Sequence, residues 1–297
     1  MIGTALFPLA MTTPNLLVPP GKKIDLSNYN PADTGQFESK ESAQIKLAAG
    51  IIQLAEYQSI LYAQNKHAIL IIFQAMDAAG KDSTIKHVMS GVNPQGCQVY
   101  SFQAPSQEEL DHDYLWRDRK CLPERGRIGI FNRSYYEETL IVRVHPELLA
   151  AQRLSTVDLK QIWHQRFAEI NDFERYLTNN GTVIIKFFLN VSKAEQKRRF
   201  LARINEPAKN WKFSASDIQE RAHWDEYQAA YTDVFNHTST ESAPWYIIPA
   251  DKKWFTRLAV AEIICSRLKQ LDLAYPELSK EQKDQLLAAK TMLEVEN

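Results

Sequence analysis

The sequence predicts an α/β fold in which helices cover both faces of a parallel sheet of about five strands. Two observations predict this fold. Short apolar strands alternate with segments of helical periodicity, and the first strand runs into a turn and a helix of the type that binds phosphate. The predicted strands cover residues 69–73, 98–102, 127–131, 182–189 and 245–249.

Helices are predicted between these strands from the spacing of apolar residues and from the positions of breakers. They cover residues 39–65, 108–120, 156–179 and 253–271, with one more opening at Asp82 and one running from Lys193 to a break at 205–207. The first 38 residues contain five prolines, which predicts an extended, partly mobile arm. We therefore divide the chain into an arm (1–38), one domain (39–272) and a C-terminal tail (273–297).

Composition limits the class of protein. The chain has 297 residues, 44% of them hydrophobic, which suits a globular protein with a large core. A formal net charge of −1 argues against nucleic-acid binding by bulk charge. Three cysteines without paired spacing indicate a reducing compartment, and no segment has the roughly 18 uninterrupted apolar residues of a membrane span. We expect a cytoplasmic protein that binds neither nucleic acid nor membranes.

The turn from Ala75 to Lys81 carries the strongest chemical signal. A strand that ends in small residues lets backbone N–H groups surround an anion, while a helix N-terminus and a lysine add positive charge. The match to G-x-x-x-x-G-K-[ST] is incomplete, because Ala75 replaces the first glycine and Asp82 stands where the metal-binding hydroxyl belongs. The carboxylates of Asp77 and Asp82 can hold Mg²⁺ beside phosphate. An ordinary strand–helix turn with a surface lysine is the alternative.

A polar tip follows the third predicted strand. Asn132, Arg133 and Glu137 lie beyond its carboxyl end, which is where open parallel sheets bind ligands. Arg133 can donate two hydrogen bonds to phosphate, and Glu137 can position a nucleotide or an ion-bound water. Alternatively, Arg133 pairs with Glu137 or Glu138 and stabilises a polar strand end.

A basic segment follows the fourth predicted strand. Lys197, Arg199 and Arg203 lie on a predicted helix, and the two arginines share one face of it. That face can bind a phosphate chain, whereas a solvated basic helix is the alternative. The break at Glu206 and Pro207 fits a lid that closes over substrate.

Three motifs in this order resemble the polyphosphate kinase 2 family. They are the run Met76–Asp82, the tip Phe131–Glu137 and the segment Arg199–Phe213, and the resemblance covers about residues 40–272. It implies a P-loop kinase-like three-layer fold with a helical lid at about 192–225. It also implies an enzyme that uses Mg²⁺ and moves phosphoryl groups between inorganic polyphosphate and nucleotides.

Position by position, the resemblance implies catalytic roles for Asp77, Lys81 and Arg133. Asp77 is also implied as the Mg²⁺ ligand, and Asn132, Arg133 and Glu137 as nucleotide-binding residues. Many relatives have Asp-Arg at the strand tip, and because an amide is a poorer Mg²⁺ ligand than a carboxylate, Asn132 shifts metal binding toward Asp77. The residues implied to bind phosphate or polyphosphate are Ala78, Ala79, Gly80, Lys81, Asp82, Ser83, Lys197, Arg199 and Arg203.

The predicted function is phosphoryl transfer from inorganic polyphosphate to nucleoside mono- and diphosphates. An ATP-dependent nucleoside monophosphate kinase is one alternative, and a non-catalytic nucleotide-binding regulatory module is another. A regulatory switch is expected to keep Ser or Thr directly after the loop lysine, where this chain has Asp82. We also expect the protein to be a homo-oligomer.

Overall fold

Five parallel strands form one sheet in the order β2-β3-β1-β4-β5. The computed structural model describes residues 16–155, 158 and 161–296. The prediction of a parallel sheet of about five strands is confirmed, and every strand ends within one residue of its predicted bounds. The strands are β1 (Ala68–Gln74), β2 (Cys97–Ser101), β3 (Ile128–Asn132), β4 (Thr182–Asn190) and β5 (Trp245–Pro249).

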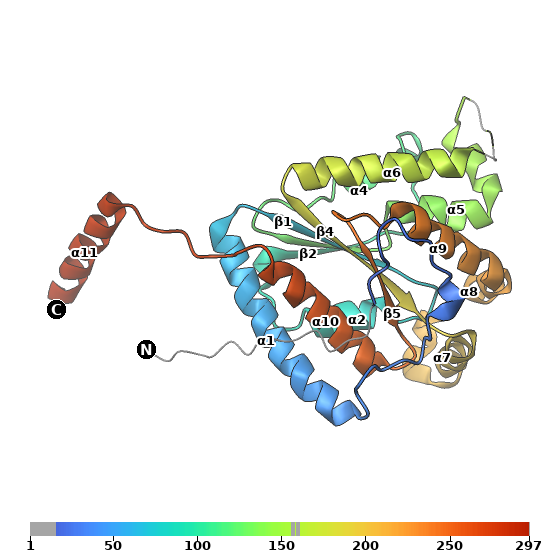
Figure 1. The fold of residues 1–297 in the computed structure, drawn as a ribbon, viewed down its shortest axis with the longest axis horizontal. Coiled ribbons are helices and arrows are strands. Elements are labelled where there is room, and N and C mark those ends of the chain that lie inside the picture. The colour runs from blue at the N-terminus through green and yellow to red at the C-terminus, as the bar shows by residue number, and fades with distance from the viewer. Residues whose placement is uncertain (1–15, 156–157, 159–160, 297) are drawn as a thin grey trace.

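Helices cover both faces of this sheet (Figure 1). All residues of the central strand β1 are buried, as expected for a strand between two helical layers. On one of the faces, Phe188 of β4 packs against Phe235. The three-layer α/β architecture is therefore confirmed. The helices of one layer are α1 (Lys40–Gln64), α2 (Lys81–Val88) and α10 (Lys253–Lys269), and those of the other are α6 (Ile162–Asn179) and α9 (Trp224–Thr238).

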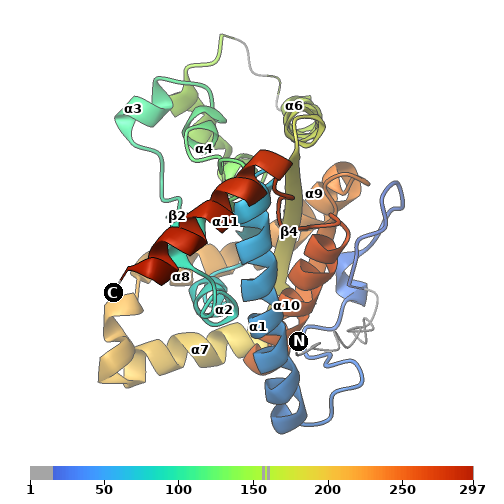
Figure 2. The same cartoon turned by 90° about the vertical axis from the view of Figure 1, so that its left-hand side faces the viewer.

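Shorter helices connect these elements, and those of the lid segment (residues 193–223, from α7 to η6) help to line the cavity beyond the carboxyl ends of the strands. The shorter helices and the lid helices are η1 (Leu26–Asn28), η2 (Pro94–Gly96), α3 (Gln107–Leu110), α4 (Trp116–Arg119), η3 (Tyr135–Thr139), α5 (Ile141–Val144), η4 (Pro146–Gln152), α7 (Lys193–Asn205), η5 (Pro207–Lys212), α8 (Ala215–Glu220) and η6 (Arg221–His223). A last helix, α11 (Lys280–Val295), stands away from the body of the molecule (Figure 1), on the side that faces the viewer in Figure 2.

Two predicted helices are corrected by the structure. The continuous helix predicted over 108–120 is wrong, because a turn separates α3 from α4. In that turn the Asp113 side chain accepts a hydrogen bond from the backbone N–H of Leu115 (3.0 Å), which gives the backbone a partner outside a helix. The helix predicted from residue 156 begins at Ile162 instead, and residues 156, 157, 159 and 160 lie outside the described part of the chain.

The described part of the predicted arm is anchored to the sheet. Leu16 and Val18 are buried, and Val18 pairs with Trp245 of β5 through a backbone hydrogen bond of 2.9 Å. A second bond joins Ile247 to Leu16 (2.8 Å). Residues 16–18 of the arm therefore lie along the edge of β5, because apolar residues between the prolines cover that edge, and the division into arm, domain and tail stays a prediction. Residues 1–15 lie outside the described part.

None of the helices in the described residues combines the length and the apolar character needed to cross a membrane.

Candidate active site

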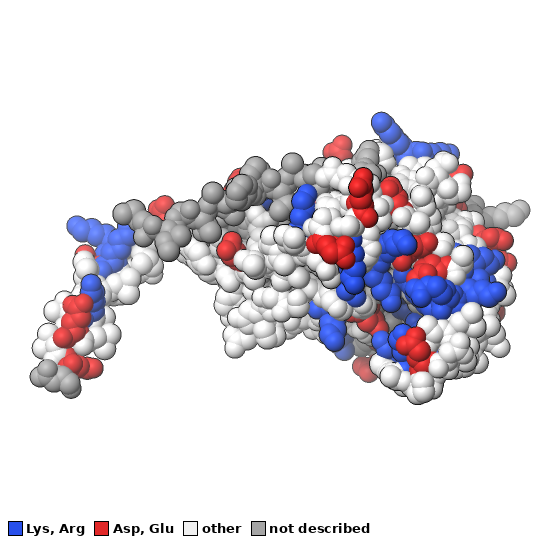
Figure 3. Space-filling view, turned by 90° about the horizontal axis from the view of Figure 1, so that it is seen from below, with Lys and Arg blue, Asp and Glu red and all other residues white. Residues whose placement is uncertain are grey.

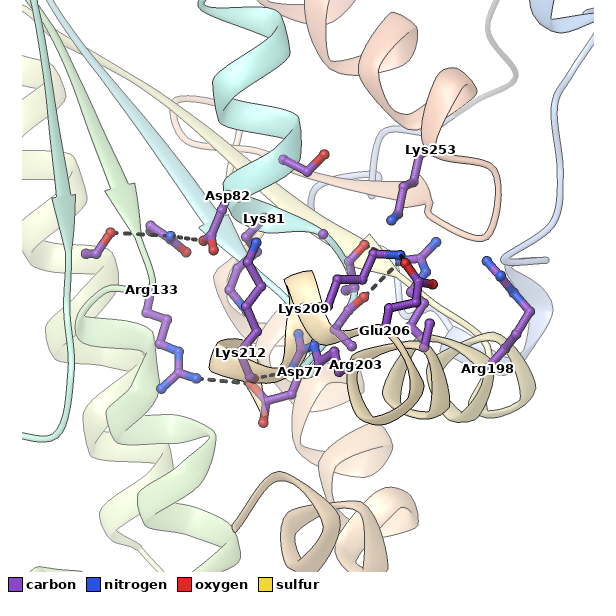
Figure 4. Close-up of a pocket in the computed structure, with 18 of the residues that line it drawn as sticks. Asp77, Lys81, Asp82, Arg133, Arg198, Arg203, Glu206, Lys209, Lys212 and Lys253 are labelled. Atoms are coloured by element: carbon purple, nitrogen blue, oxygen red, sulfur yellow. Dashed lines mark hydrogen bonds and ion pairs between the residues drawn. The ribbon is translucent and has the colours of Figure 1, made fainter. Parts of the chain in front are cut away.

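The carboxyl ends of β1 and β3 bring the phosphate loop (Ala75–Lys81) and the polar strand tip together. The backbone N–H of Arg133 donates to the carbonyl of Phe73 (3.0 Å), which places the β3 tip beside the loop. Together with the lid segment they line a cavity of about 380 Å³, which we call the phosphate cavity. Figure 4 shows Asp77, Lys81 and Arg133 around this cavity, together with side chains from the lid segment.

The phosphate loop has the backbone of an anion-binding turn. Gly80 precedes α2 with a φ of +110°, a conformation that suits glycine because a side chain there is strained. Ala78 has a φ of +59°, which is uncommon for a residue with a side chain and is typical of functional sites. No side chain caps the N-terminus of α2. The partial positive charge of this helix end therefore faces the phosphate cavity.

Lys81 places an ammonium group in the wall of the cavity. Its Nζ donates to the carbonyl oxygen of Ala75 (2.9 Å), across the loop. Burial lowers the pKa of Lys81, and the nearby cation Arg133 lowers it further, while Asp77 is the main group that opposes this effect. A phosphate group in the cavity would add negative charge beside the ammonium and stabilise its charged form.

Arg133 pairs with the loop and not with the glutamate that follows it at position 138. Its Nη2 donates to Oδ1 of Asp77 (3.1 Å), whereas Glu138 pairs with Arg166 (3.0 Å). Burial opposes the charge on Arg133, but Glu137 and Asp77 outweigh it and raise the pKa of the guanidinium. Arg133 also has a φ of +65°. The strand tip therefore presents a fixed cation at the junction of β1 and β3.

Asn132 contacts the loop helix from the same strand. Its amide Nδ2 donates to Oδ1 of Asp82 (2.7 Å) and lies 3.4 Å from Oγ of Ser101. Asp82 occupies the position where the common motif has a metal-binding hydroxyl. The amide thus holds one carboxylate oxygen of Asp82 in the wall of the phosphate cavity.

Arg199 holds the loop in place. Its side chain is 6% exposed, and its Nη1 donates to the carbonyl oxygens of Ala78 (2.9 Å) and Ala79 (2.6 Å). Its Nη2 donates to the carbonyl of Ala250 (2.6 Å), directly after β5, and its Nε donates to Glu195 (2.7 Å). We expected Arg199 to face polyphosphate. The structure places Arg199 in the wall of the phosphate cavity and directs its donors to backbone carbonyls, which tie α7, the loop and β5 together, and its contact with polyphosphate stays a prediction.

The other predicted side chains of the lid and of α2 differ in whether they line the phosphate cavity. Arg203 lines the phosphate cavity and pairs with Asp217 of the lid segment (2.8 Å). Lys197 is exposed and is not part of the cavity wall. The Ser83 hydroxyl lines the cavity and accepts a hydrogen bond from Arg257 (2.9 Å). Of these, Arg203 and Ser83 are therefore in reach of a ligand in the phosphate cavity.

Four cations of the cavity wall were not among the predicted site residues. Lys209 and Lys212 reach in from η5, and their place beside the predicted lid break was the signal that could have identified them. Lys253 opens α10 directly after β5, so its place at a strand end was the second signal. Arg198 lies at the far end of the cavity from Arg133 (Figure 4).

In total the wall holds eight Lys and Arg residues and three acidic ones, and Figure 3 shows a gathering of basic side chains on this face.

A second cavity adjoins the first. It has a volume of about 330 Å³, and we call it the apolar pocket. Phe102, Gln103 and Arg133 line both cavities, so the two meet at the β3 tip. Glu137 lines the apolar pocket beside Arg133. Its apolar wall includes Phe102, Pro105, Leu110, Ile141, Val142 and Leu148.

The described residues contain no group of three or more His, Cys, Asp or Glu side chains arranged to hold a metal ion. Asp77 and Asp82 both line the phosphate cavity. Enzymes that transfer phosphoryl groups generally use a divalent cation, and such a cation is commonly held by one or two carboxylates together with substrate phosphates and water. The two aspartates fit a metal that binds together with the substrate.

Comparisons with known proteins identify the family. The polyphosphate kinase 2 family model matches residues 37–276. The ADP-polyphosphate phosphotransferase of Rhodopseudomonas palustris is 49% identical over 287 residues, which cover 96% of this chain and 99% of that protein. The AMP/ADP-polyphosphate phosphotransferase of Meiothermus ruber is 43% identical over 88% of this chain and 94% of its own length.

A solved structure agrees with these sequences. The crystal structure of polyphosphate kinase 2 from Arthrobacter aurescens superposes with a TM-score of 0.82 at 41% identity, over 91% of this chain and 94% of that one. The resemblance carried by the three sequence motifs is thereby confirmed. The chain belongs to the polyphosphate kinase 2 family.

Proposed function

We propose that the protein transfers phosphoryl groups from inorganic polyphosphate to nucleoside mono- and diphosphates. One observation carries the proposal: Arg133 lies where a cavity lined by eight basic residues meets an apolar pocket. The phosphate cavity suits a polyanionic chain, because its cations extend from the phosphate loop to the lid segment. The apolar pocket suits a nucleoside, whose base is largely apolar on its faces.

The related enzymes support both substrates. The relative from Rhodopseudomonas palustris is named for ADP and polyphosphate, and the one from Meiothermus ruber for AMP, ADP and polyphosphate. A nucleotide in the apolar pocket would direct its terminal phosphate toward Arg133, and a polyphosphate end in the phosphate cavity would approach from the side of Lys81. The two reacting groups therefore meet between these two cations.

The proposed step is a direct displacement. An oxygen of the terminal nucleotide phosphate attacks the terminal phosphorus of polyphosphate, the bridging P–O bond breaks, and the chain leaves one phosphate shorter. The attacking oxygen is already ionised near neutral pH, so the step needs no strong base. Lys81, Arg133 and the lid cations stabilise the charge on the migrating group. Asp77 orients Arg133 through their ion pair.

The metal is proposed to be Mg²⁺. Asp77 is the proposed ligand, and Asp82, held by Asn132, is the second carboxylate of the cavity wall. The ion would neutralise charge on the reacting phosphates. Asn132 acts in this proposal through Asp82, and Glu137 contacts the nucleotide in the apolar pocket. Inorganic polyphosphate and nucleotides are the proposed partners, in the cytoplasm.

A substrate panel tests the proposal. The protein is incubated with Mg²⁺ and each of AMP, ADP, GMP and GDP, with long-chain polyphosphate as donor in one series and ATP in a second, and the nucleotides are separated by ion-exchange chromatography. We expect new di- or triphosphates with at least one acceptor, and at least a hundredfold lower rate for Lys81→Ala, which excludes a contaminating kinase. Product formation with ATP but not with polyphosphate would identify an ATP-dependent kinase instead. Tight nucleotide binding without any product would identify a regulatory module.

A further inference from the structure

His145 joins the body of the molecule to the lid segment. It lies between α5 and η4, and its side chain is 21% exposed. Its Nε2 lies 3.0 Å from Oε2 of Glu220, the last residue of α8, and its Nδ1 lies 3.3 Å from Oε1 of Glu147 in η4. A neutral imidazole carries one N–H and can donate to only one of these carboxylates, whereas the protonated ring donates to both.

Glu220 is the point at which α8 is attached to the body. Its Oε2 also accepts a hydrogen bond from the hydroxyl of Tyr227 in α9 (2.7 Å). Within the described part of the chain, the contacts of Glu220 with His145 and Tyr227 are the only hydrogen bonds between α8 and elements outside the lid segment. The position of α8 therefore depends on this one carboxylate.

Helix α8 has little apolar surface packed against the body. None of its residues is buried, and Ile218 is 43% exposed. A cavity of about 230 Å³ lies between α8 and the strand tips, with Asp217 and Glu220 on the side of the helix and Asp77 on the side of the phosphate loop. The helix can therefore shift relative to the loop without disturbing the core.

Helix α8 in turn holds a cation of the phosphate cavity. Oδ2 of Asp217 accepts a hydrogen bond from Nη1 of Arg203 (2.8 Å), and both side chains are 20% exposed. Arg203 lines the phosphate cavity together with Lys212. A shift of α8 would move Arg203 or break its bond to Asp217, and either event changes the positive charge that the cavity presents to phosphate.

We propose that the protonated ring of His145 holds α8 in place and, through Asp217, keeps Arg203 at the phosphate cavity. His145 is then a positioning residue of the reaction, since it does not line the phosphate cavity itself. This role rests on the proposed function, in which the phosphate cavity binds polyphosphate. Loss of the proton leaves one of the two carboxylates without its donor, so α8 is held less firmly and polyphosphate binds less tightly.

The groups around the ring favour its charged form. Burial lowers the pKa of His145, but Glu220 and Glu147 outweigh this effect and raise the pKa above its ordinary value of 6.5. His223 of η6 lies beside the ring, with 4.9 Å between the ring centroids, and pairs with Glu226 of α9 (2.9 Å). The attachment is therefore complete below the raised pKa of His145 and is weakened as the pH rises through it.

Steady-state kinetics with polyphosphate between pH 6 and pH 9 test the proposal in two variants of His145. His145→Gln cannot carry the charge, so at pH 6 its KM for polyphosphate should be roughly threefold higher than that of the unaltered protein, with kcat within about twofold. At pH 9 the two KM values should coincide. His145→Lys stays charged across this range and should keep the lower KM at pH 9. Comparing the proteins at each pH cancels the titration of the substrates.

His223→Gln is the matched control. His223 lies beside His145, but it pairs with Glu226 close by in the chain and does not join α8 to the body. Its KM for polyphosphate should follow that of the unaltered protein at every pH. An equal rise in KM for His223→Gln and His145→Gln would overturn the proposal, because the effect would then not come from the attachment at Glu220.

Two measurements without turnover distinguish this proposal from the proposed function. Proton NMR identifies His145 by the ring resonance that is missing in His145→Gln, and Glu220→Gln should lower the pH of its titration midpoint. Binding of fluorescently labelled polyphosphate should show the same pH-dependent difference between the unaltered protein and His145→Gln as the KM does. A protein that shows this difference in binding but phosphorylates no nucleotide would refute the proposed function alone. Parallel pH profiles of binding for these two proteins, or an unchanged midpoint in Glu220→Gln, would overturn the role of His145.

Discussion

Asn132 and Asp82 are joined by a hydrogen bond of 2.7 Å, in which the amide nitrogen donates to a carboxylate oxygen in the wall of the phosphate cavity. A carboxylate at position 132 could not make this bond in its ionised form. The asparagine thus orients the Asp82 carboxylate at the position where the common phosphate-loop motif carries a hydroxyl.

Asn132→Asp should make the protein more dependent on metal. Two ionised carboxylates at hydrogen-bond distance repel one another, and a divalent cation between them relieves the repulsion. We expect a lower melting temperature than that of the unaltered protein without Mg²⁺, and a larger upward shift on adding Mg²⁺. Asn132→Ala removes the bond without adding charge and should show no enlarged shift. Equal Mg²⁺ shifts for the unaltered protein and Asn132→Asp would contradict this account of the pair.

Arg199 and Arg203 should separate stability from substrate binding. Arg199→Lys cannot reproduce the bonds of the guanidinium to the carbonyls of Ala79 and Ala250, so we expect a loss of about 2 kcal/mol or more in the free energy of unfolding. Arg203→Lys should change the unfolding free energy by less than about 1 kcal/mol and raise the KM for polyphosphate instead. Urea unfolding and steady-state kinetics distinguish them, and equal losses of stability would refute the assignment.

A buried ion pair in the core contacts the two tyrosines that follow the strand tip. Lys186 of β4 donates to Glu174 of α6 (2.5 Å), and both side chains are at most 1% exposed. The hydroxyls of Tyr135 (2.9 Å) and Tyr136 (2.8 Å), which follow the Asn-Arg-Ser tip, also donate to Glu174. The pair therefore connects the core to the segment that carries Glu137.

Lys186→Met should be strongly destabilising. It leaves Glu174 buried without its cation, and such a change costs roughly 3–5 kcal/mol. The double variant Lys186→Met/Glu174→Gln should recover part of the lost unfolding free energy, because no buried charge is then left unpaired. Urea unfolding of the two variants measures this recovery. A double variant that is less stable than Lys186→Met would mean that the ion pair is not the source of the effect.

Asp118 should make stability fall as the pH rises. Burial raises the pKa of Asp118 to about 7, from an ordinary value of 3.8. Between these two values the folded chain keeps a proton that the unfolded chain has lost, so folding is favoured at the acidic end and the benefit disappears as pH approaches 7. Asp118→Asn does not titrate and should lack this decline. Urea unfolding at several pH values from 5 to 8 should show the unfolding free energy of the unaltered protein falling relative to that of Asp118→Asn up to about pH 7, so that the two curves move apart, and parallel curves would rule out the shifted pKa.

The sheet could be predicted from sequence because its signals are local. Each strand is a short apolar run between breakers, so the strand bounds and the loop at Ala75–Lys81 followed from the local order of residues. Helix 108–120 could not be predicted correctly, because a single side-chain bond at Asp113 interrupts it. The anchoring of residues 16–18 depends on pairing with β5, which lies more than 200 residues later in the chain.

The sequence indicated which residues lie at the phosphate cavity more reliably than it indicated what each of them contacts. Lys81 and Arg133 line the phosphate cavity, as their positions at strand ends indicated. Arg199 shares a helix face with Arg203, but only the folded chain shows that the carbonyls of the loop take up its donors. Lys253 lies in the cavity wall because β5, which precedes it, lies on the same side of the sheet as β4. The spacing of apolar residues in the sequence does not reveal this order of strands.

The central claim is that the phosphate cavity holds polyphosphate and the apolar pocket holds the nucleotide. Steady-state kinetics with ADP and long-chain polyphosphate test it in two variants. Lys209→Ala/Lys212→Ala removes cations from the phosphate cavity, and Leu148→Trp puts a larger side chain in the wall of the apolar pocket. We predict that the lysine variant raises the KM for polyphosphate at least tenfold and leaves the KM for ADP within twofold, and that Leu148→Trp does the reverse. Variants that both raise the same KM would contradict the assignment of two substrates to two cavities.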